Sequence, residues 1–244
     1  MEFSTLSPNE RVVLISGASS GIGLETTKIL INAGYKLSIG VRNVEKAEEI
    51  YKNYNKDHIL INYYNTIDYD SIRIWIENTI NNFSNIDALI NNAGIYLKTD
   101  INDDKCIDDL NKLWQTNVLG PFKLTQEVLP HIRKSKNGRI INIASTDAKR
   151  YRETVSIGYS MVKHSLLAMS NGIRINEWEN NVRVTALCPG AVETNLLNGI
   201  EGVTPSKNRI DPKTIGNTIN YILSLPNNSI VSEFVMNSRL ESSF

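Results

Sequence analysis

Tyr159 and Lys163 have the residue types and the spacing to support proton transfer within this 244-residue chain. Side chains four residues apart in a helix project from one face, one turn apart. A phenol has a reference pKa of about 10, so it is a poor proton donor or acceptor at neutral pH. A cation one turn away favours the phenolate and brings the group closer to the working range. An ordinary surface pair has the same spacing, so the surrounding elements must decide between the two interpretations.

A glycine-rich stretch near the N-terminus lies between an expected strand and an expected helix. Residues 11–16 form a short β-branched run typical of a buried strand, and glycines follow at positions 17, 21 and 23. Glycine lets the backbone turn tightly and approach a ligand, and a helix N-terminus offers free N–H groups to phosphate. The stretch therefore predicts a phosphate-binding turn, with a simple connection as the alternative. No Gly-Lys-Ser/Thr follows, which excludes a Walker loop.

The end of the second expected strand, residues 35–40, indicates which dinucleotide would bind. In dinucleotide-binding folds an acidic residue about 20 residues after the glycines favours NAD, whereas an arginine accommodates the 2′-phosphate of NADP. The sequence here is Val41-Arg42-Asn43, with no acidic residue. The planar guanidinium of Arg42 suits phosphate. We predict that NADP(H) is preferred and that NAD(H) is possible; a solvated loop arginine is the alternative.

Strand and helix patterns alternate along the rest of the chain. We expect further strands at residues 58–62, 86–90, 139–144, 182–187 and 233–236. We expect helices at residues 44–53, 69–83 and 104–135, a helix through Tyr159 to about residue 179, and a last helix at 212–225. This alternation favours an α/β fold with a mainly parallel sheet covered by helices on both faces. No repeat or linker is visible, so residues 1–244 are expected to form a single domain.

Composition excludes several other classes of function. Acidic and basic residues balance at 26 each, which gives no global field for nucleic acid or an anionic membrane. No apolar run approaches the ~18 residues of a membrane span. The two cysteines are far apart and the three histidines are scattered, so no metal-ligand set is visible. The start of the chain lacks a secretory signal pattern, and we expect a cytoplasmic setting.

Six motifs occur in order along the chain and together resemble the short-chain dehydrogenase/reductase family. They are Ser16-Gly17-x-x-x-Gly21-Ile22-Gly23, Asn91-Asn92-Ala93-Gly94, Asn117, Ser145, Tyr159-x-x-x-Lys163 and Pro189-Gly190-x-Val192-x-Thr194. The resemblance implies a Rossmann-type, doubly wound sheet of about seven strands. It also implies an NADP-dependent oxidoreductase that transfers a hydride between NADP(H) and a carbonyl or secondary alcohol substrate, and a homo-oligomer, either a tetramer or a dimer.

The resemblance assigns roles to individual residues. Reduction of a carbonyl builds negative charge on oxygen, which needs a hydrogen-bond donor and then a proton. The implied catalytic set comprises a donor, a proton source, a ribose-binding cation and a residue that positions a relay water: Ser145, Tyr159, Lys163 and Asn117. The implied cofactor-binding residues are Gly17, Ser19, Ser20, Gly21, Ile22, Gly23, Arg42, Asn65, Thr66, Asn91, Ala93, Gly94, Tyr159, Lys163, Pro189, Gly190, Val192 and Thr194.

Four features depart from the family pattern or leave alternatives open. Asn65-Thr66 replaces the family's usual Asp and aliphatic residue, and Ser20 replaces the arginine that some NADP-using members carry in the glycine turn. Residues 195–210 resemble a mobile substrate lid, with a plain loop as the alternative. Lys149, Arg150 and Arg152 could attract an anionic substrate or form a solvated face.

Two other functions remain open at this stage. They are an NAD-dependent alcohol dehydrogenase of the same family and a non-catalytic dinucleotide-binding sensor. The complete catalytic set favours the enzyme, because a sensor needs neither Ser145 nor Tyr159. For the homo-oligomer, the supporting apolar residues lie on two expected helices: Leu110, Leu113, Trp114, Leu124, Leu166, Leu167 and Met169.

Overall fold

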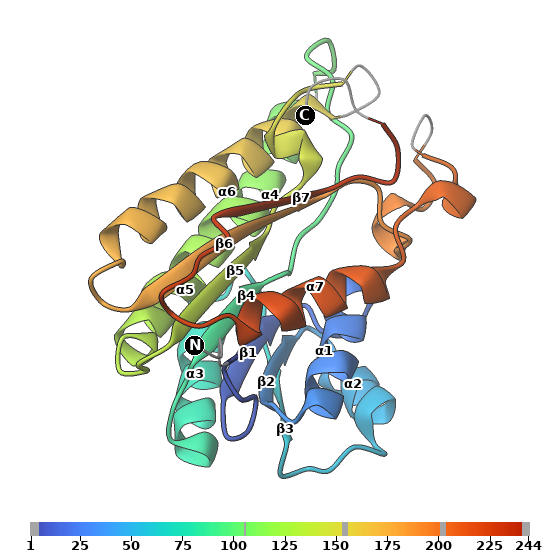
Figure 1. Ribbon diagram of the computed structural model, residues 1–244. Coiled ribbons are helices and arrows are strands. Elements are labelled where there is room, and N and C mark those ends of the chain that lie inside the picture. Colours follow the sequence, from blue (N-terminus) through green and yellow to red (C-terminus); the bar gives the residue numbers. More distant parts are fainter. Residues whose placement is uncertain (1–4, 105, 153–155, 201–203, 241–244) are drawn as a thin grey trace.

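The computed structural model describes residues 5–104, 106–152, 156–200 and 204–240. Seven strands form one sheet in the order β3-β2-β1-β4-β5-β6-β7, and every neighbouring pair is parallel (Figure 1). The strands are β1 Val12–Ser16, β2 Lys36–Val41, β3 Ile59–Tyr63, β4 Ala88–Asn91, β5 Gly138–Ile143, β6 Val182–Pro189 and β7 Glu233–Met236. This topology confirms the predicted Rossmann-type fold.

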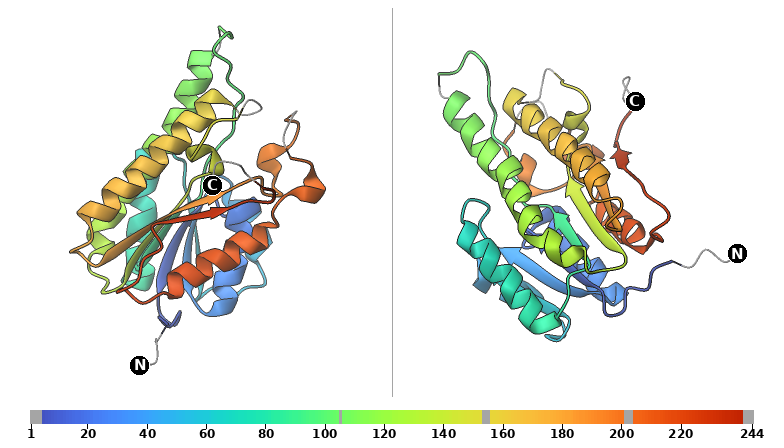
Figure 2. Two further views of the ribbon diagram at one scale, coloured as in Figure 1. Left: turned by 45° about the horizontal axis from the view of Figure 1, so that its top comes forward. Right: turned by 90° about the vertical axis from the view of Figure 1, so that its left-hand side faces the viewer.

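Helices cover both faces of the sheet (Figure 2). One layer contains α1 Gly21–Ala33, α2 Val44–Tyr51 and α7 Pro212–Ser224. The opposite layer contains α3 Tyr69–Phe83, α4 Cys106–Trp114, α5 Gly120–Ile132 and α6 Ile157–Asn176. The central strands β1, β5 and β6 are buried along their whole length, as expected when both faces of a sheet are covered.

The expected helical region over residues 104–135 is continuous from Cys106 to Ile132, but it is not α-helical throughout. A π-helical turn, η1 Gln115–Leu119, separates α4 from α5, and Asn117 lies in its middle. Pro121 follows this turn inside the continuous helix and has no N–H to donate, so one helical hydrogen bond is missing there. Such π turns are frequent at functional sites, because they redirect side chains within a helix.

The apolar residues expected to support an oligomer belong mostly to the core of the subunit. Leu113, Leu124 and Leu166 are buried, so they carry no argument for an interface. Other large apolar side chains on the same three helices are exposed: Ile107, Trp114, Phe122 and Met161. Within the described ranges no helix is long and apolar enough to cross a membrane.

Candidate active site

A cleft of about 980 Å³ opens at the carboxyl ends of the strands. The sheet order reverses between β1 and β4, and ligands of open parallel sheets bind at such a point. Most of the predicted site residues line this cleft: Gly17, Ser19, Ser20, Gly21, Ile22, Arg42, Asn65, Thr66, Ala93, Gly94, Ser145, Tyr159, Lys163, Pro189, Gly190, Val192 and Thr194.

The glycine turn has the backbone conformation that the sequence pattern indicates. Gly17 and Gly21 adopt positive φ angles of 72° and 54°, which L side chains rarely tolerate. A Cβ atom on Gly21 would lie 3.0 Å from Cγ2 of Thr194, across the cleft. Gly23 lies behind the lining, where a Cβ would lie 2.3 Å from the carbonyl oxygen of Gly17. The turn therefore leaves room for a ligand at the start of α1 and packs closely behind it.

Hydrogen bonds hold the glycine turn against the loop that follows β4. The hydroxyl of Ser16 accepts hydrogen bonds from the backbone N–H groups of Asn92 and Ala93, both at 3.0 Å. The Asn92 amide donates to the carbonyl oxygens of Ser16 at 2.9 Å and Gly17 at 3.0 Å. The sequence prediction omitted Asn92, which lines the cleft. Strand side chains alternate between faces, and this alternation could have separated the roles of the two neighbouring asparagines.

Asn91 lies beneath the cleft rather than in its lining. Its amide nitrogen donates to Oγ1 of Thr125 at 2.9 Å and to Oδ1 of Asn142 at 2.8 Å. Asn142 in turn donates to Ser170 of α6 at 2.8 Å. The side chain expected to contact the cofactor thus joins the strands to the helix layer that carries Tyr159 and Lys163.

Asn117 is also buried, and the π turn aims it at the loop after β4. Its Oδ1 accepts from the Ile95 N–H at 2.9 Å, and its Nδ2 donates to the Ile95 carbonyl at 2.8 Å. Both the oxygen and the nitrogen of the Asn117 amide are therefore hydrogen-bonded to the backbone of Ile95. The side chain fixes the Gly94–Ile95 segment of the cleft wall, and its expected role in a water relay stays a prediction.

Ser145, Tyr159 and Lys163 converge at one end of the cleft. Ser145 lies two residues after β5, and its Oγ accepts from the N–H of Asp147 at 3.0 Å. The hydroxyl of Ser156 caps α6 by accepting from the N–H of Tyr159 at 3.2 Å, which sets the first turn that carries the phenol. The Lys163 amine donates to the Ile143 carbonyl at 2.8 Å and lies 5.5 Å from the centre of the Tyr159 ring.

Burial shifts the pKa values of both groups on α6. Desolvation raises the pKa of Tyr159 well above 10, the charge of Asp147 and the neighbouring Tyr96 add to this, and a hydrogen bond with Ser145 opposes it. Burial lowers the pKa of Lys163 to about 8, against the charges of Cys188 and Asp147. The expected lowering of the phenol's pKa by Lys163 is not what the structure shows, because desolvation outweighs it.

Tyr96 is a cleft residue that sequence reasoning missed. Its ring centre lies 4.9 Å from that of Tyr159, and its hydroxyl accepts from the N–H of Ser156 at 3.2 Å. It therefore packs against the phenol and braces the start of α6. Its position two residues after the Asn-Asn-Ala-Gly motif was the available signal.

Two cations lie at the opposite end of the cleft. Arg42 is exposed directly after β2, and Asn43 caps α2 by accepting from the N–H of Lys46 at 2.8 Å. This cap fixes the start of α2 next to the cleft. Lys46, like Arg42, lines the cleft. The sequence prediction did not include Lys46. Its place at the start of a capped helix after the second strand could have indicated it.

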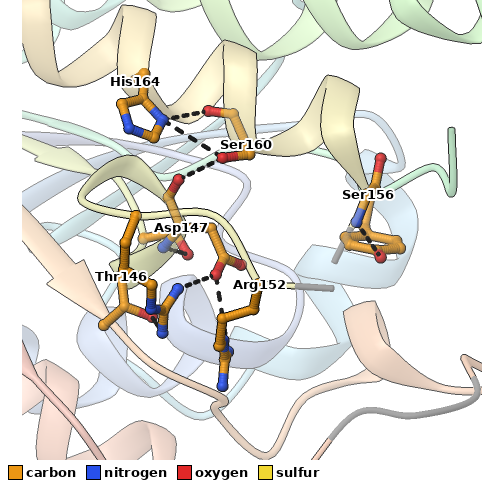
Figure 3. A network of polar contacts seen from close by, with 9 residues as sticks. Thr146, Asp147, Arg152, Ser156, Ser160 and His164 are labelled. Carbon is orange, nitrogen blue, oxygen red and sulfur yellow. Dashed lines mark hydrogen bonds and ion pairs between the residues drawn. The ribbon is translucent and has the colours of Figure 1, made fainter. Parts of the chain in front are cut away.

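The basic run after Ser145 contains two residues outside the cleft lining, Lys149 and Arg150, and one residue within it, Arg152. Lys149 bonds Glu233 at 2.6 Å, and Arg150 bonds Asp147 at 2.5 Å. Neither lines the cleft, whereas Arg152 does. Figure 3 shows Arg152 beside the Asp147 carboxylate, at a distance of 3.7 Å.

The expected lid is described at residues 195–200 and 204–210; its remaining residues lie outside the described ranges. It contains two short 3₁₀ turns, η3 Asn195–Leu197 and η4 Ser206–Asn208. Hydrogen bonds from Ile210 N–H to Ala191 O at 2.8 Å and from Glu193 N–H to Ile210 O at 2.9 Å join its ends. The side of the segment that faces the cleft is formed by Asn195, Leu196, Leu197 and Thr204.

No group of three or more His, Cys, Asp or Glu residues that could hold a metal ion occurs among the residues the structure describes. The donor set at the cleft consists of hydroxyls, amides, backbone N–H groups and cations. Such groups suit phosphates, ribose hydroxyls and a carbonyl oxygen.

The chain matches known proteins over most of its length. A family model described as short chain dehydrogenase matches residues 11–202. An uncharacterised oxidoreductase of Staphylococcus saprophyticus is 36% identical over 236 residues, covering 93% of this chain and 95% of that protein. An agropine synthesis reductase of Rhizobium rhizogenes is 30% identical over 220 residues, covering 90% of this chain and 50% of that protein.

Solved structures show the same fold. A 3-ketoacyl-(acyl-carrier-protein) reductase from Brucella melitensis complexed with NADH aligns with a TM-score of 0.86 at 24% identity, covering 95% of this chain and 98% of that one. ElxO with NADP bound aligns with a TM-score of 0.82 at 23% identity, covering 93% and 97%. From the family match, the relatives and the geometry of the cleft, the chain belongs to the short-chain dehydrogenase family of oxidoreductases.

Proposed function

We propose that this oxidoreductase transfers a hydride between NADP(H) and a carbonyl or secondary alcohol, with Tyr159 as the general acid or base. The observation that carries the proposal is the layout of a single cleft. Ser145, Tyr159 and Lys163 meet at one end, and Arg42 and Lys46 lie at the other, beyond the glycine turn. A bound nicotinamide would supply the hydride.

The cleft suits a dinucleotide on three counts. The positive-φ glycines leave the space at the start of α1 that a side chain would fill, as the 3.0 Å distance to Thr194 illustrates. The N-terminus of α1 can then donate its free N–H groups to a pyrophosphate. Lys163 is placed to hold the nicotinamide ribose next to Tyr159, because both lie on one face of α6.

The serine and tyrosine hydroxyls can act together on one carbonyl oxygen. Because Ser145 Oγ accepts the Asp147 N–H, its own hydrogen is available to a substrate oxygen. Ser145 acts on the pKa of Tyr159 against the effect of burial, so the phenol lies near the same hydroxyl. The raised pKa keeps Tyr159 protonated at neutral pH, which suits reduction, whereas alcohol oxidation needs the phenolate.

A panel of aldehydes and ketones, assayed by the loss of NADPH absorbance, tests the proposed activity. We expect NADPH to be consumed with at least one class of carbonyl compound. A protein that binds NADPH and consumes none with any class would instead be a dinucleotide sensor.

Cofactor preference is expected to depend on Arg42 and Lys46. Removing both cations by Arg42→Leu with Lys46→Gln should weaken NADPH binding roughly ten- to a hundredfold, the size of one charge-assisted hydrogen bond. NADH binding should change little, because NADH has no 2′-phosphate. Titration of both cofactors against parent and variant gives the measurement. If the parent binds NADH as tightly as NADPH, the NAD-dependent alternative is the correct one.

We further propose a homo-oligomer, assembled through the exposed face of α4, α5 and α6 that carries Trp114, Phe122 and Met161. Exposed large apolar groups gathered on adjoining helices are typical of interfaces. Light scattering at micromolar concentration is expected to give the mass of a tetramer or a dimer, and Phe122→Ser should shift the population toward smaller species. A parent protein of about 27.4 kDa in solution would contradict this proposal.

A further inference from the structure

We propose that the substrate carries a carboxylate as well as the reacting carbonyl, and that Arg152 and Arg239 bind this carboxylate. The proposal rests on the function above and adds the substrate class. The argument starts from the distribution of charge, since the whole chain balances 26 acidic against 26 basic residues.

The residues that line the cleft do not share the balance of acidic and basic residues found in the whole chain. Among the described residues that line it, Asp147 is the one acidic residue, and the basic residues are Arg42, Lys46, Lys112, Arg152, Lys163 and Arg239. Arg42 and Lys46 lie at the end assigned to the adenosine ribose, and Lys163 lies at the other end, where it is assigned to the nicotinamide ribose. The proposed cofactor assigns no role to the remaining lining cations, which are Lys112, Arg152 and Arg239.

Asp147 sets the position of Arg152. This carboxylate lies two residues after Ser145 and contacts two guanidinium groups, those of Arg150 and Arg152. Arg150 binds it at 2.5 Å and also donates to Oγ1 of Thr146 at 3.2 Å, which ties Arg150 to the 3₁₀ turn η2 Thr146–Ala148. Arg152 forms an ion pair with the same carboxylate at 3.7 Å.

Arg152 is the arginine of this pair that faces the substrate space. Its side chain is 24% exposed against 10% for Arg150, and it lines the cleft whereas Arg150 does not. A guanidinium in a partly dry cleft presents a planar fork that matches a carboxylate, and the low local dielectric strengthens the bond. Its place next to the Ser145 turn would set a carboxylate beside the reacting carbonyl.

Arg239 approaches the same space from the lid side. It follows β7, and together with Thr204 of the lid segment it lines both the cleft and a neighbouring cavity of about 560 Å³. Two arginines from separate parts of the chain therefore line the cleft that Tyr159 and the lid segment also line. A substrate with a carboxylate is the small molecule whose chemistry fits both of them.

The test compares matched acid and ester substrates. 4-Carboxybenzaldehyde and methyl 4-formylbenzoate differ in charge and little else, so their kcat/KM ratio reports recognition of the carboxylate. We expect the parent to prefer the acid, Arg152→Gln to lower the acid-to-ester ratio by about tenfold or more, and Arg239→Gln to lower it as well. Raising NaCl from about 0.05 to about 0.5 M should also lower the ratio in the parent, because salt screens the attraction.

Arg150→Gln is the matched control, because it also removes a cation from Asp147 but leaves the cleft lining unchanged. The acid-to-ester ratio should stay the same in this variant. An equal loss of the ratio in Arg150→Gln would overturn the proposal, since the effect would then act through Asp147. Arg239 is exposed, so Arg239→Gln keeps the test valid even if Arg152→Gln folds poorly.

Calorimetry separates this inference from the proposed reaction. Benzoate and benzamide are titrated into protein saturated with NADP⁺, which requires no turnover. Tighter binding of benzoate, weakened by Arg152→Gln or by Arg239→Gln, supports the carboxylate site even if neither aldehyde is reduced. Equal binding of benzoate and benzamide overturns the carboxylate site. An acid-to-ester ratio near one in an active enzyme also overturns the carboxylate site, but it leaves the proposed function standing.

Discussion

Replacing Tyr159 with phenylalanine is expected to reduce turnover by at least about three orders of magnitude, or some 4 kcal/mol of transition-state stabilisation. The variant keeps the ring, which packs against Tyr96 at 4.9 Å and forms one buried cluster with Leu113 and Val162. Fold and NADPH binding should therefore survive nearly intact. The variant loses the hydroxyl, which lies beside Ser145 and is the proposed proton donor to the carbonyl oxygen.

Tyr96→Phe is the matched control for this prediction. It removes a second phenolic hydroxyl from the same cleft, one that accepts a hydrogen bond from the Ser156 N–H and is not assigned to proton transfer. We expect Tyr96→Phe to stay within about tenfold of the parent, the loss of one ordinary hydrogen bond. Steady-state turnover and cofactor titration of both variants provide the measurement. If Tyr159→Phe keeps a tenth of parental activity, Tyr159 is not the proton donor.

Lys163→Met is expected to lower turnover by about 10²–10⁴-fold and also to weaken cofactor binding, because the amine is assigned to both steps. Methionine keeps the length of the buried stem, so the variant isolates the amine. In the parent, the pKa of Lys163 is lowered to about 8, so the cation is lost as pH rises through that value. The kcat/KM for NADPH, which reports on the free enzyme, should fall above about pH 8 in the parent and show no such fall in the variant.

The same substitution should raise the free energy of unfolding at neutral pH. Lys163 binds a proton less readily in the folded state than in the unfolded state, so its buried charge costs stability at all pH values below about 8. That cost disappears as pH rises from about 8 to the ordinary value of about 10.5. On the order of 3 kcal/mol is expected at pH 7, and urea denaturation at about pH 7 and about pH 10 measures it. If the variant is no more stable than the parent at pH 7, the buried charge of Lys163 does not lower the free energy of unfolding.

The strands and the residues of the cleft were accessible from the sequence because each depends on local patterns. β-branched runs between helical stretches predicted the seven strands, and β7 and α3 have the expected bounds. The π turn was not predictable, because residues 115–119 continue the helical pattern. The turn instead coincides with the bonds from Asn117 to Ile95, a contact 22 residues away along the chain.

Burial was the main property that the sequence did not show. Leu113 and Leu124 are apolar in either an interface or a core, and only the packed structure places them in the core. The pKa of Tyr159 was expected to fall because Lys163 is close, but the surrounding apolar groups raise it. Lys46 and Arg239 carry no motif at all, and they reach the cleft through the α2 cap and the end of β7.

A deuterium-transfer experiment tests the central claim most directly. Parent protein is mixed with NADPH doubly deuterated at C4 of the nicotinamide and with 4-carboxybenzaldehyde, and the products are identified by mass spectrometry and NMR. The proposed function predicts one alcohol formed for each NADPH consumed, with deuterium on the carbinol carbon, and no product within the same time from Tyr159→Phe. Alcohol without deuterium on that carbon, or equal product from Tyr159→Phe, would contradict hydride transfer assisted by Tyr159.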